Sequence, residues 1–327
     1  MRDLSMATGI SHTKWQGKTQ GTGTAGCLEL NYEDKTPETA VMLTPPGQYS
    51  ALYAQSDKNL LFYGDNIPVL AYLANHVDIR GKIRLVYIDP PYATGMVFQS
   101  RSQTDAYQDM LMGANYLEFL RQRLIFLREL LADDGSIYVH LDENMAFYVK
   151  VIMDEVFGAS NFKNWITRRK SNPKNYTRKR FGDISDYIMF YTKSDDYIWN
   201  RPYEAWTSDG IEREYPYFEK ESGRRYKKVP IHAPGTRNGE TGQPWRGMNP
   251  PPGKHWQYTP ATLDRMDQRG EIYWSPTGNP RRKVFLDESA GKPAQDIWLD
   301  FRDAHNQNIE ITGYPTEKNP NLLARII

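Results

Sequence analysis

Cysteine is almost absent from this chain of 327 residues, which contains only Cys27. One cysteine cannot build an internal disulfide framework, and it excludes a zinc site made of several cysteines. The chain also lacks an apolar run near the roughly twenty residues that span a bilayer, and its first thirty residues lack the apolar core of a signal peptide. We therefore expect a cytoplasmic protein without a membrane segment.

A strong excess of charge is also missing, because the formal net charge is +1. This value by itself argues neither for nor against a nucleic-acid partner, since a phosphate backbone responds to the local distribution of charge. The length allows one large or two medium domains with a substantial core.

The most informative segment is an apolar run, Ile83 to Ile88, followed directly by Asp89, Pro90, Pro91 and Tyr92. This pattern predicts a buried parallel strand that ends in a rigid loop. Open α/β sheets bind their ligands at the carboxyl ends of such strands. Because each proline fixes φ and removes an N–H group, the carbonyl groups of this loop can only accept hydrogen bonds.

A carboxylate and a carbonyl that accept hydrogen bonds beside a flat ring suit an exocyclic amino group on a planar heterocycle. The amino group of a nucleobase fits this description. The alternative is structural, because two prolines can simply stop a strand while Tyr92 packs on its rim.

The segments around this loop predict an α/β fold with strands and helices in alternation. Apolar residues spaced by three and four predict a helix over 116–131, and Gly135 precedes a strand over 136–141. Asp142 is expected to cap a helix that reaches Phe157 and stops at Gly158. Further strands fit 165–168 and 186–191. The order of elements predicts a parallel layer.

We expect four regions along the chain: an extended N-terminal lead of unassigned function over 1–57, a catalytic α/β domain over 58–194, a strand- and loop-rich insert over 195–298, and a return segment over 299–327. The insert is rich in Pro, Gly, Trp, Tyr and Arg. Short strands that present aromatic rings and arginines suit the reading of DNA, although a loop-rich embellishment without such a role is the alternative.

A basic run extends from Lys163 to Arg180, in the part of the catalytic domain that precedes the insert. It contains no acidic residue and carries Lys163, Arg168, Arg169, Lys170, Lys174, Arg178, Lys179 and Arg180. Such a run is either a solvated loop or an arm that follows a phosphate backbone, and the neighbouring motif favours the DNA-binding arm.

Four motifs in one order carry a resemblance to a known family. They are Phe62–Asn66, the Asp-Pro-Pro-Tyr loop with Ala93-Thr94-Gly95, Asp134–Val139 and Thr312–Lys318. From about Asn59 to Ile327 the chain resembles DNA amino-methyltransferases, and among these the adenine-N6 enzymes that include modification subunits of type III restriction-modification systems. The resemblance implies a Rossmann-like methyltransferase sheet with an inserted target-recognition domain.

The resemblance also implies a mechanism. A target adenine is flipped out of double-stranded DNA, Tyr92 stacks on it, and the Asp89 carboxylate with the Pro90 carbonyl accepts hydrogen bonds from N6, while Pro91 stiffens the loop. These bonds align the nitrogen lone pair with a methyl group on a sulfonium donor.

The implied cofactor is S-adenosylmethionine, and no metal is required. Asp65, Asn66, Asp89, Thr316 and Lys318 match positions at the cofactor site. Two of these residues have alternative explanations, because Asp65 also suits the N-cap of a helix and Lys318 could be an exposed loop lysine.

Some features depart from the family pattern. Related sequences continue into a glycine-rich FxGxG turn that holds the cofactor, and this chain stops at Ile327 before it. The Gly21–Gly26 pattern is no substitute, because neither a strand nor a long helix flanks it. Ala93 stands where many adenine enzymes carry asparagine.

We therefore expect an incomplete sheet whose cofactor half lies on a following segment or a separate polypeptide. An inactive DNA-binding remnant is the alternative. Cytosine-N4 modification is the weaker alternative, because those enzymes more often carry serine in place of the Asp89 carboxylate. Expected partners are double-stranded DNA, a C-terminal cofactor half or restriction subunit, and a second copy of the chain at an exposed sheet edge.

Overall fold

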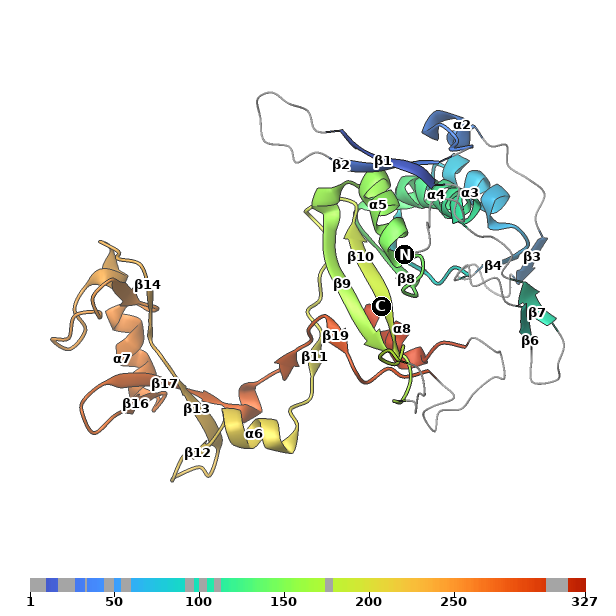
Figure 1. Ribbon diagram of the computed structural model, residues 1–327. Coiled ribbons are helices and arrows are strands. Elements are labelled where there is room, and N and C mark those ends of the chain that lie inside the picture. The colour runs from blue at the N-terminus through green and yellow to red at the C-terminus, as the bar shows by residue number, and fades with distance from the viewer. Residues whose placement is uncertain are drawn as a thin grey trace. The chain divides into compact units, whose positions relative to one another are not determined.

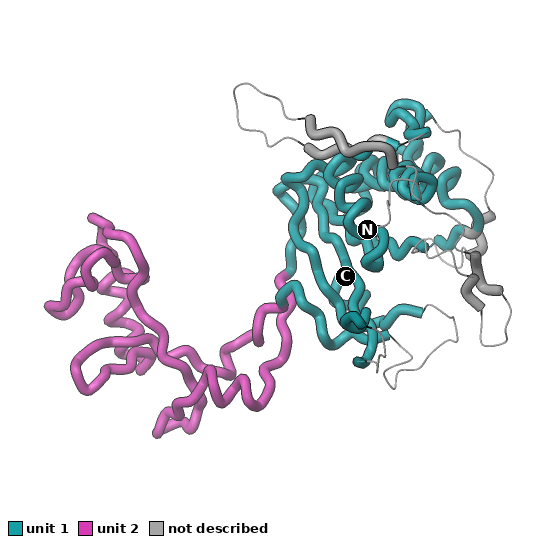
Figure 2. Tube along the Cα trace, in the orientation of Figure 1, with its two compact units in different colours: residues 1–200, 295–327 teal, residues 201–294 magenta. Residues whose placement is uncertain are grey.

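The computed structural model describes residues 10–16, 27–32, 34–43, 50–53, 60–91, 97–99, 105–108, 113–173, 179–303 and 317–327. The chain divides into two compact units (Figure 2). The first comprises residues 1–200 and 295–327, and the second comprises residues 201–294. Each unit has its own core.

Figure 1 shows the elements of the first unit and labels most of them. They are β1 (Ile10–Gln16), β2 (Cys27–Tyr32), α2 (Glu38–Met42), β3 (Ser50–Tyr53), β4 (Leu61–Tyr63), α3 (Asn66–Asn75), β5 (Ile83–Ile88), β6 (Val97–Gln99), β7 (Asp105–Gln108), α4 (Gly113–Leu130), β8 (Leu131–Leu141), α5 (Ala146–Phe157), η1 (Ala159–Asn161), β9 (Phe162–Arg169), β10 (Ser185–Thr192), β19 (Ile297–Trp298) and α8 (Pro320–Ile326).

The main sheet has the strand order β19-β9-β10-β8-β5 among the described strands. The predicted α/β fold is confirmed, since β5 and β8 pair in parallel around the crossover helix α4. The predicted parallel layer comprises β5 and β8, whereas the later strand β10 runs antiparallel to both β8 and β9. An antiparallel neighbour needs no crossover helix, so the chain can turn back directly after β9.

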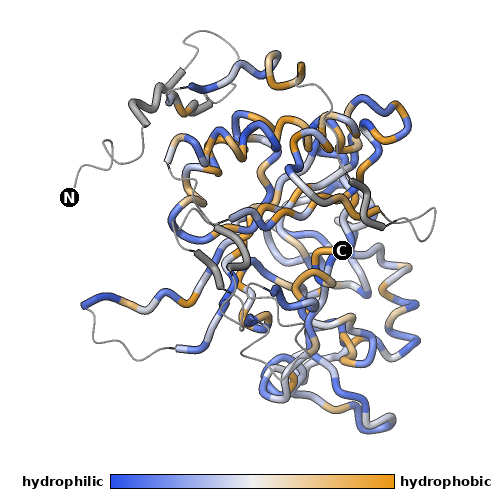
Figure 3. Tube along the Cα trace, turned by 90° about the vertical axis from the view of Figure 1, so that its right-hand side faces the viewer, coloured by the Kyte–Doolittle hydropathy of each residue, from blue (hydrophilic) through white to orange (hydrophobic). Residues whose placement is uncertain are grey.

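The sheet is covered on both faces. On one face, Val139 and Met189 belong to the same buried cluster as Leu120 and Leu124 of α4. On the other face, residues such as Ile188 pack in a cluster with Leu322 and Ile326 of α8. Figure 3 shows the hydrophobic colour of the C-terminal end. Because successive strand side chains point to opposite faces, neighbouring residues of β8 enter different clusters.

Part of the expected N-terminal lead belongs to the core. Leu30 and Val41 are buried in the cluster that includes α4 and α5. The Tyr32 hydroxyl donates to Glu118 over 2.8 Å, and Arg121 donates to the Thr36 carbonyl over 2.8 Å. The lead therefore packs on the helices of the first unit.

The start of α5 differs from the expectation. Asp142 does not cap the helix, because its carboxylate accepts from the Asn144 N–H over 3.1 Å and closes a turn that precedes the helix. The helix begins at Ala146 with Met145 as N-cap. The predicted stop is confirmed, because Gly158 follows the helix at φ 90°, where a side chain would be strained.

The second unit contains β11 (Tyr203–Glu204), α6 (Ser208–Glu214), β12 (Tyr217–Phe218), β13 (Arg225–Val229), β14 (His232–Pro234), η2 (Glu240–Gly242), β15 (Lys254–Trp256), α7 (Pro260–Gln268), β16 (Ile272–Trp274), β17 (Pro280–Phe285), η3 (Leu286–Glu288) and β18 (Lys292–Pro293). One sheet has the order β12-β13-β17-β16. The buried core of the second unit includes Trp245, Trp256 and Leu263.

Candidate functional site

Asp89 and Lys318 form an ion pair at the carboxyl end of β5. The Lys318 Nζ lies 3.3 Å from the Asp89 Oδ2, and their side chains are only 17% and 26% exposed. Lys318 stands directly before Asn319, the N-cap of α8, whose side chain accepts from the Asn321 N–H. Asn319 also donates to the Arg302 carbonyl over 3.0 Å, which ties the start of α8 to the segment after β19.

A chain of polar side chains crosses the sheet beside this pair. The Tyr87 hydroxyl is 2.7 Å from the His140 Nδ1, and the His140 Nε2 is 2.9 Å from the Asp186 Oδ2. When Nε2 carries the ring proton, it faces the Asp186 carboxylate and Nδ1 can accept from the Tyr87 hydroxyl. This arrangement links β5, β8 and β10.

Arg168 extends the chain of contacts to β9. Its guanidinium is fully buried and donates to Asp186 over 2.7 Å, to Asp303 over 2.7 Å and to the Phe301 carbonyl over 2.5 Å. A buried arginine held by three acceptors cannot reach a DNA phosphate. The expectation that Arg168 contacts DNA is therefore wrong.

The electrostatic environment of these groups is strongly perturbed. Burial raises the pKa of Tyr87 well above its ordinary value, and the nearby charge of Asp89 raises it further. Burial alone would raise the pKa of Asp186, but His140, Arg168 and then Lys318 outweigh it and hold the pKa below its ordinary value. Asp186 is therefore kept as a carboxylate close to Lys318.

Asp65 and Asn66 lie at the start of α3, where Arg123 of α4 holds both. The Arg123 Nη2 donates to Asp65 over 2.8 Å and its Nε donates to Asn66 over 2.5 Å. The Asp65 side chain is 64% exposed and also accepts from the Ile67 N–H over 3.0 Å. The expected N-cap role is confirmed, and the exposed carboxylate stays available to a ligand.

The described members of the basic run have several acidic neighbours that the local sequence does not reveal. Lys163 pairs with Asp195 over 2.7 Å, and Arg180 pairs with Asp183 over 2.7 Å. Lys170 lies 3.9 Å from Glu143. Arg169 is half-buried, and Lys179 is exposed. The run is thus less uniformly positive than its sequence indicates.

Several expected residues lie outside the described part of the chain. These are Tyr92, Ala93, Thr316, Lys174, Arg178 and the Gly21–Gly26 pattern. Pro90 and Pro91 are described as half-buried residues directly after Asp89. The structure therefore brings Asp89 and Lys318 together and places Asp65 and Asn66 at the start of α3.

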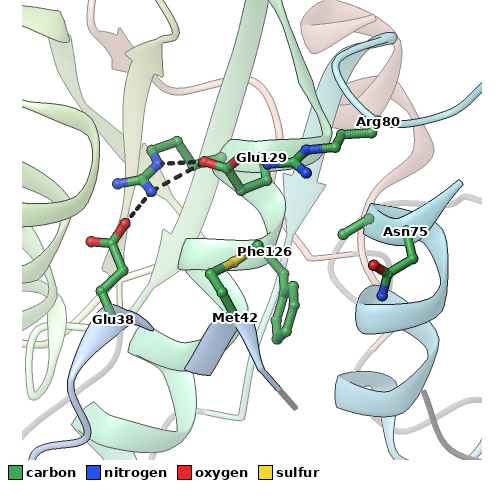
Figure 4. Close-up of a pocket in the computed structure, with 8 residues that line it drawn as sticks. Glu38, Met42, Asn75, Arg80, Phe126 and Glu129 are labelled. Carbon is green, nitrogen blue, oxygen red and sulfur yellow. Dashed lines mark hydrogen bonds and ion pairs between the residues drawn. The ribbon is translucent and has the colours of Figure 1, made fainter. Parts of the chain in front are cut away.

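A pocket of about 430 Å³ lies on the helical side of the first unit (Figure 4). Its lining includes Met42, Phe126 and an ion-pair cluster in which Arg128 contacts Glu38 and Glu129. None of the residues expected at the catalytic or cofactor site lines it. Its charged groups already neutralise one another.

Sequence reasoning missed Tyr87, His140, Asp186 and Arg123. One signal was present for Tyr87, because it is a polar-tipped residue in an apolar run and stands two residues before Asp89. His140 and Asp186 lie in apolar strands, where an isolated polar residue signals a buried polar contact. Their partners lie far away in sequence, so the pairing itself was not predictable.

Every helix that the structure describes is too short or too polar to span a membrane. Within the same residues, no group of three or more His, Cys, Asp or Glu side chains is placed so that it could hold a metal ion.

Curated relatives match most of this chain. It is 47% identical over 308 residues to the type II methyltransferase M.EcaI of Enterobacter cloacae, covering 92% of this chain and 67% of that protein. It is 25% identical over 328 residues to the type III restriction-modification enzyme StyLTI Mod subunit of Salmonella typhimurium, covering 89% of this chain and 49% of that subunit. The chain thus spans about two thirds of the first protein and half of the second.

Solved structures give a weaker likeness. The PvuII DNA methyltransferase, described as cytosine-N4-specific, shares 16% sequence identity with a TM-score of 0.28, covering 39% of this chain and 48% of that chain. This similarity is too low to support an argument.

The family model for DNA methylases of the N6 and N4 type matches residues 83–327, which is most of the chain. M.EcaI is also similar to this chain over almost the whole sequence. Together the two matches show that the chain belongs to the N6/N4 DNA methylase family.

Proposed function

We propose that this chain is the catalytic and recognition part of a DNA methyltransferase that transfers a methyl group from S-adenosylmethionine to N6 of a flipped-out adenine. The observation that carries the proposal is the placement of Asp89. Its carboxylate lies at the carboxyl end of β5, directly before two prolines and against Lys318. This is the edge where α/β sheets bind ligands.

The loop provides acceptors for an amino group. The Asp89 carboxylate and the Pro90 carbonyl accept the two N6 hydrogens of adenine, and Tyr92 stacks on the base. This geometry localises the nitrogen lone pair, which then forms the N–C bond as the S–C bond of the donor breaks. The proton that N6 loses passes to solvent or to the Asp89 carboxylate.

The charged residues of the site fit the ends of the cofactor. S-adenosylmethionine supplies an electrophilic methyl group on a sulfonium centre. The Lys318 ammonium suits its carboxylate, and the exposed Asp65 carboxylate suits its ammonium group. Asn66 and Thr316 complete the set that the family resemblance implies. The ion pair of Lys318 with Asp89 would place the methionine end beside the amino-binding loop.

The carboxylate of Asp89 favours adenine over cytosine. Both bases present an exocyclic amino group, so the loop by itself permits either reaction. Related cytosine-N4 enzymes more often carry serine at this position, and four of the curated relatives are named as type III Mod subunits, one of them as probable. Adenine-N6 is the proposed target, and cytosine-N4 is the second candidate.

The second unit is the proposed target-recognition domain. In its sheet, the Lys228 Nζ lies 3.6 Å from the centre of the Tyr217 ring and 3.5 Å from that of Tyr273. Arg281 stands opposite Tyr273 on the paired strand. Cations beside aromatic rings on one face suit contact with phosphates and bases.

The proposed DNA contacts also include some of the basic run. Arg169, Lys170, Lys179 and Arg180 remain candidates among the described residues, and Lys163 is a weaker one because Asp195 holds it. By analogy with the type III Mod subunits, a restriction subunit is a proposed partner.

The test is transfer of labelled methyl groups to unmethylated genomic DNA, followed by separation of the nucleosides. We expect label in N6-methyl-2′-deoxyadenosine, with none above background for Asp89→Ala. Asp133→Ala removes an exposed carboxylate at the other end of β8 and should leave transfer unchanged. Label in N4-methyl-2′-deoxycytidine would select the second candidate. Transfer that survives Asp89→Ala would reject the proposed role of this loop.

A further inference from the structure

Four polar side chains lie on one face of the main sheet, at the edge that carries Asp89. In the register of the sheet, Tyr87 of β5 pairs with Tyr138 of β8, and His140 stands two residues after Tyr138 on the same face. Asp186 of β10 pairs with Arg168 of β9. β5, β8 and β9 all approach their carboxyl ends there, while β10 begins there. Alternation along the strands places these side chains on the face that α8 covers.

This set is buried more completely than the pair beside it. His140 and Arg168 are 0% exposed and Asp186 is 1% exposed. Removing such charges from water costs free energy unless good geometry and further hydrogen bonds compensate for it. Apolar side chains of similar volume could fill the same space, so stability alone is a weak reason for the arrangement.

The set reaches both members of the Asp89–Lys318 pair. Tyr87 is the penultimate residue of β5 and Asp89 is the first residue after the strand, so a shift of the Tyr87 ring would move the start of the loop. Arg168 binds Phe301 and Asp303, and Asn319 binds Arg302 between them. Residues 301–303 are therefore held by Arg168, and Asn319, the residue next to Lys318, is bonded to the same stretch.

We propose that Tyr87, His140, Asp186 and Arg168 form a positioning network that holds Lys318 against Asp89. In this arrangement His140 and Arg168 hold the Asp186 carboxylate, and its negative charge interacts with the Lys318 ammonium through space. The network does not touch the substrate. It acts by setting the separation and direction of the two charged groups at the amino-binding loop, and its catalytic consequence rests on the proposed methyltransferase function.

The first measurement needs no methyl transfer. Lys318 is acetylated with limiting N-hydroxysuccinimide acetate, and its modification rate is measured by mass spectrometry. The Lys318 side chain is only 17% exposed and its Nζ is paired with Asp89, so the reagent reaches this amine slowly. We expect the rate to rise roughly threefold or more in Tyr87→Phe and Asp186→Asn, since each loosens Lys318.

Matched variants control for loss of an ordinary hydrogen bond. Tyr32→Phe removes a tyrosine hydroxyl bonded to Glu118, and Asp154→Asn removes a carboxylate bonded to the Tyr191 hydroxyl. Both lie on the helical side of the sheet. In both control variants the acetylation rate of Lys318 should stay within about twofold of its rate in the native protein.

The second measurement is steady-state methyl transfer. We expect Tyr87→Phe to lower kcat roughly tenfold with little change in KM for DNA, because misplacement at a reacting centre affects the transition state more than binding. If Tyr87 had only a structural role, Tyr87→Phe would lower thermal stability without lowering kcat, which is the result we expect for Tyr32→Phe. If the native protein transfers no methyl group, this chain is not a methyltransferase by itself, and the Lys318 rate still decides whether the network exists.

The proposal is overturned if Tyr87→Phe and Asp186→Asn leave the Lys318 rate equal to that of the control variants. Tyr87→Phe guards against misfolding, because it removes a single oxygen and leaves every buried charge paired. Asp186→Asn is interpreted only where its circular dichroism matches that of the native protein.

Discussion

Lys318 lies 3.3 Å from Asp89, which places the residue before the N-cap of α8 against the carboxyl end of β5. The contact joins the loop proposed to bind the amino group to the segment proposed to bind the cofactor. Both side chains are mostly buried, so the attraction is screened less than in an exposed pair. The two halves of the proposed reaction therefore meet at one ion pair.

Replacing Lys318 should impair methyl transfer. Hydrogen bonds to charged groups contribute about 1.5–3 kcal/mol, so Lys318→Met should lower kcat/KM roughly 10- to 150-fold. Lys318→Arg keeps the charge and should retain part of the activity. Lys82→Met removes an exposed lysine near the start of β5 and serves as control. Full activity of Lys318→Met would show that the ion pair has no catalytic role.

Arg123 should support both the fold and the cofactor site. Its guanidinium binds Asp65 and Asn66 and stacks on Phe119 at 3.4 Å from the ring centre. We expect Arg123→Met to lower the free energy of unfolding by about 2 kcal/mol and to weaken S-adenosylhomocysteine binding in calorimetry.

The matched control for that change is Arg80→Met. Arg80 pairs with Glu129 but is 53% exposed, so its loss should cost under about 1 kcal/mol. Equal effects of the two variants on ligand binding would contradict the special role of Arg123.

The N-terminal segment should be essential to the stability of the first unit. Leu30 is 2% exposed, and its truncation leaves a cavity in the main core. We expect Leu30→Ala to lower the free energy of unfolding by about 2–4 kcal/mol in urea. Leu43→Ala removes a leucine that is 81% exposed and should change it by under about 0.5 kcal/mol. Equal effects would mean that the segment does not pack as described.

Acid should remove the stabilising contribution of Asp186. Because the pKa of Asp186 is lowered in the folded state, its contribution is complete above the unfolded pKa of about 3.9 and is lost as pH falls through the folded value. The difference in unfolding free energy between the native protein and Asp186→Asn should be largest near about pH 6 and shrink below about pH 4. Denaturation at several pH values checks this, and a constant difference would contradict it.

DNA binding should depend on the sheet of the second unit. Lys228→Gln and Arg281→Gln should each weaken binding to every sequence and reduce the salt slope by about 1, as expected for phosphate contacts. Arg269→Gln is the control, because Arg269 pairs with Glu271 over 2.5 Å. Fluorescence anisotropy at several salt concentrations measures the slopes, and unchanged slopes would remove this face from the DNA interface.

The local sequence determined several elements of this protein. The apolar run before Asp89 predicted β5, spaced leucines predicted α4, and Gly158 predicted the end of α5. These features depend on neighbours within a few residues, so local propensity and periodicity reveal them. The motif order also identified the family without the structure.

Only the tertiary structure decided the roles of the charged residues. Arg168 stands in a basic run, yet the fold buries it against Asp186 and Asp303. The direction of β10 and the pairing of Lys318 with Asp89 likewise depend on segments distant in sequence. A sequence shows which groups can form an ion pair, but burial and the folded path of the chain determine which of them meet.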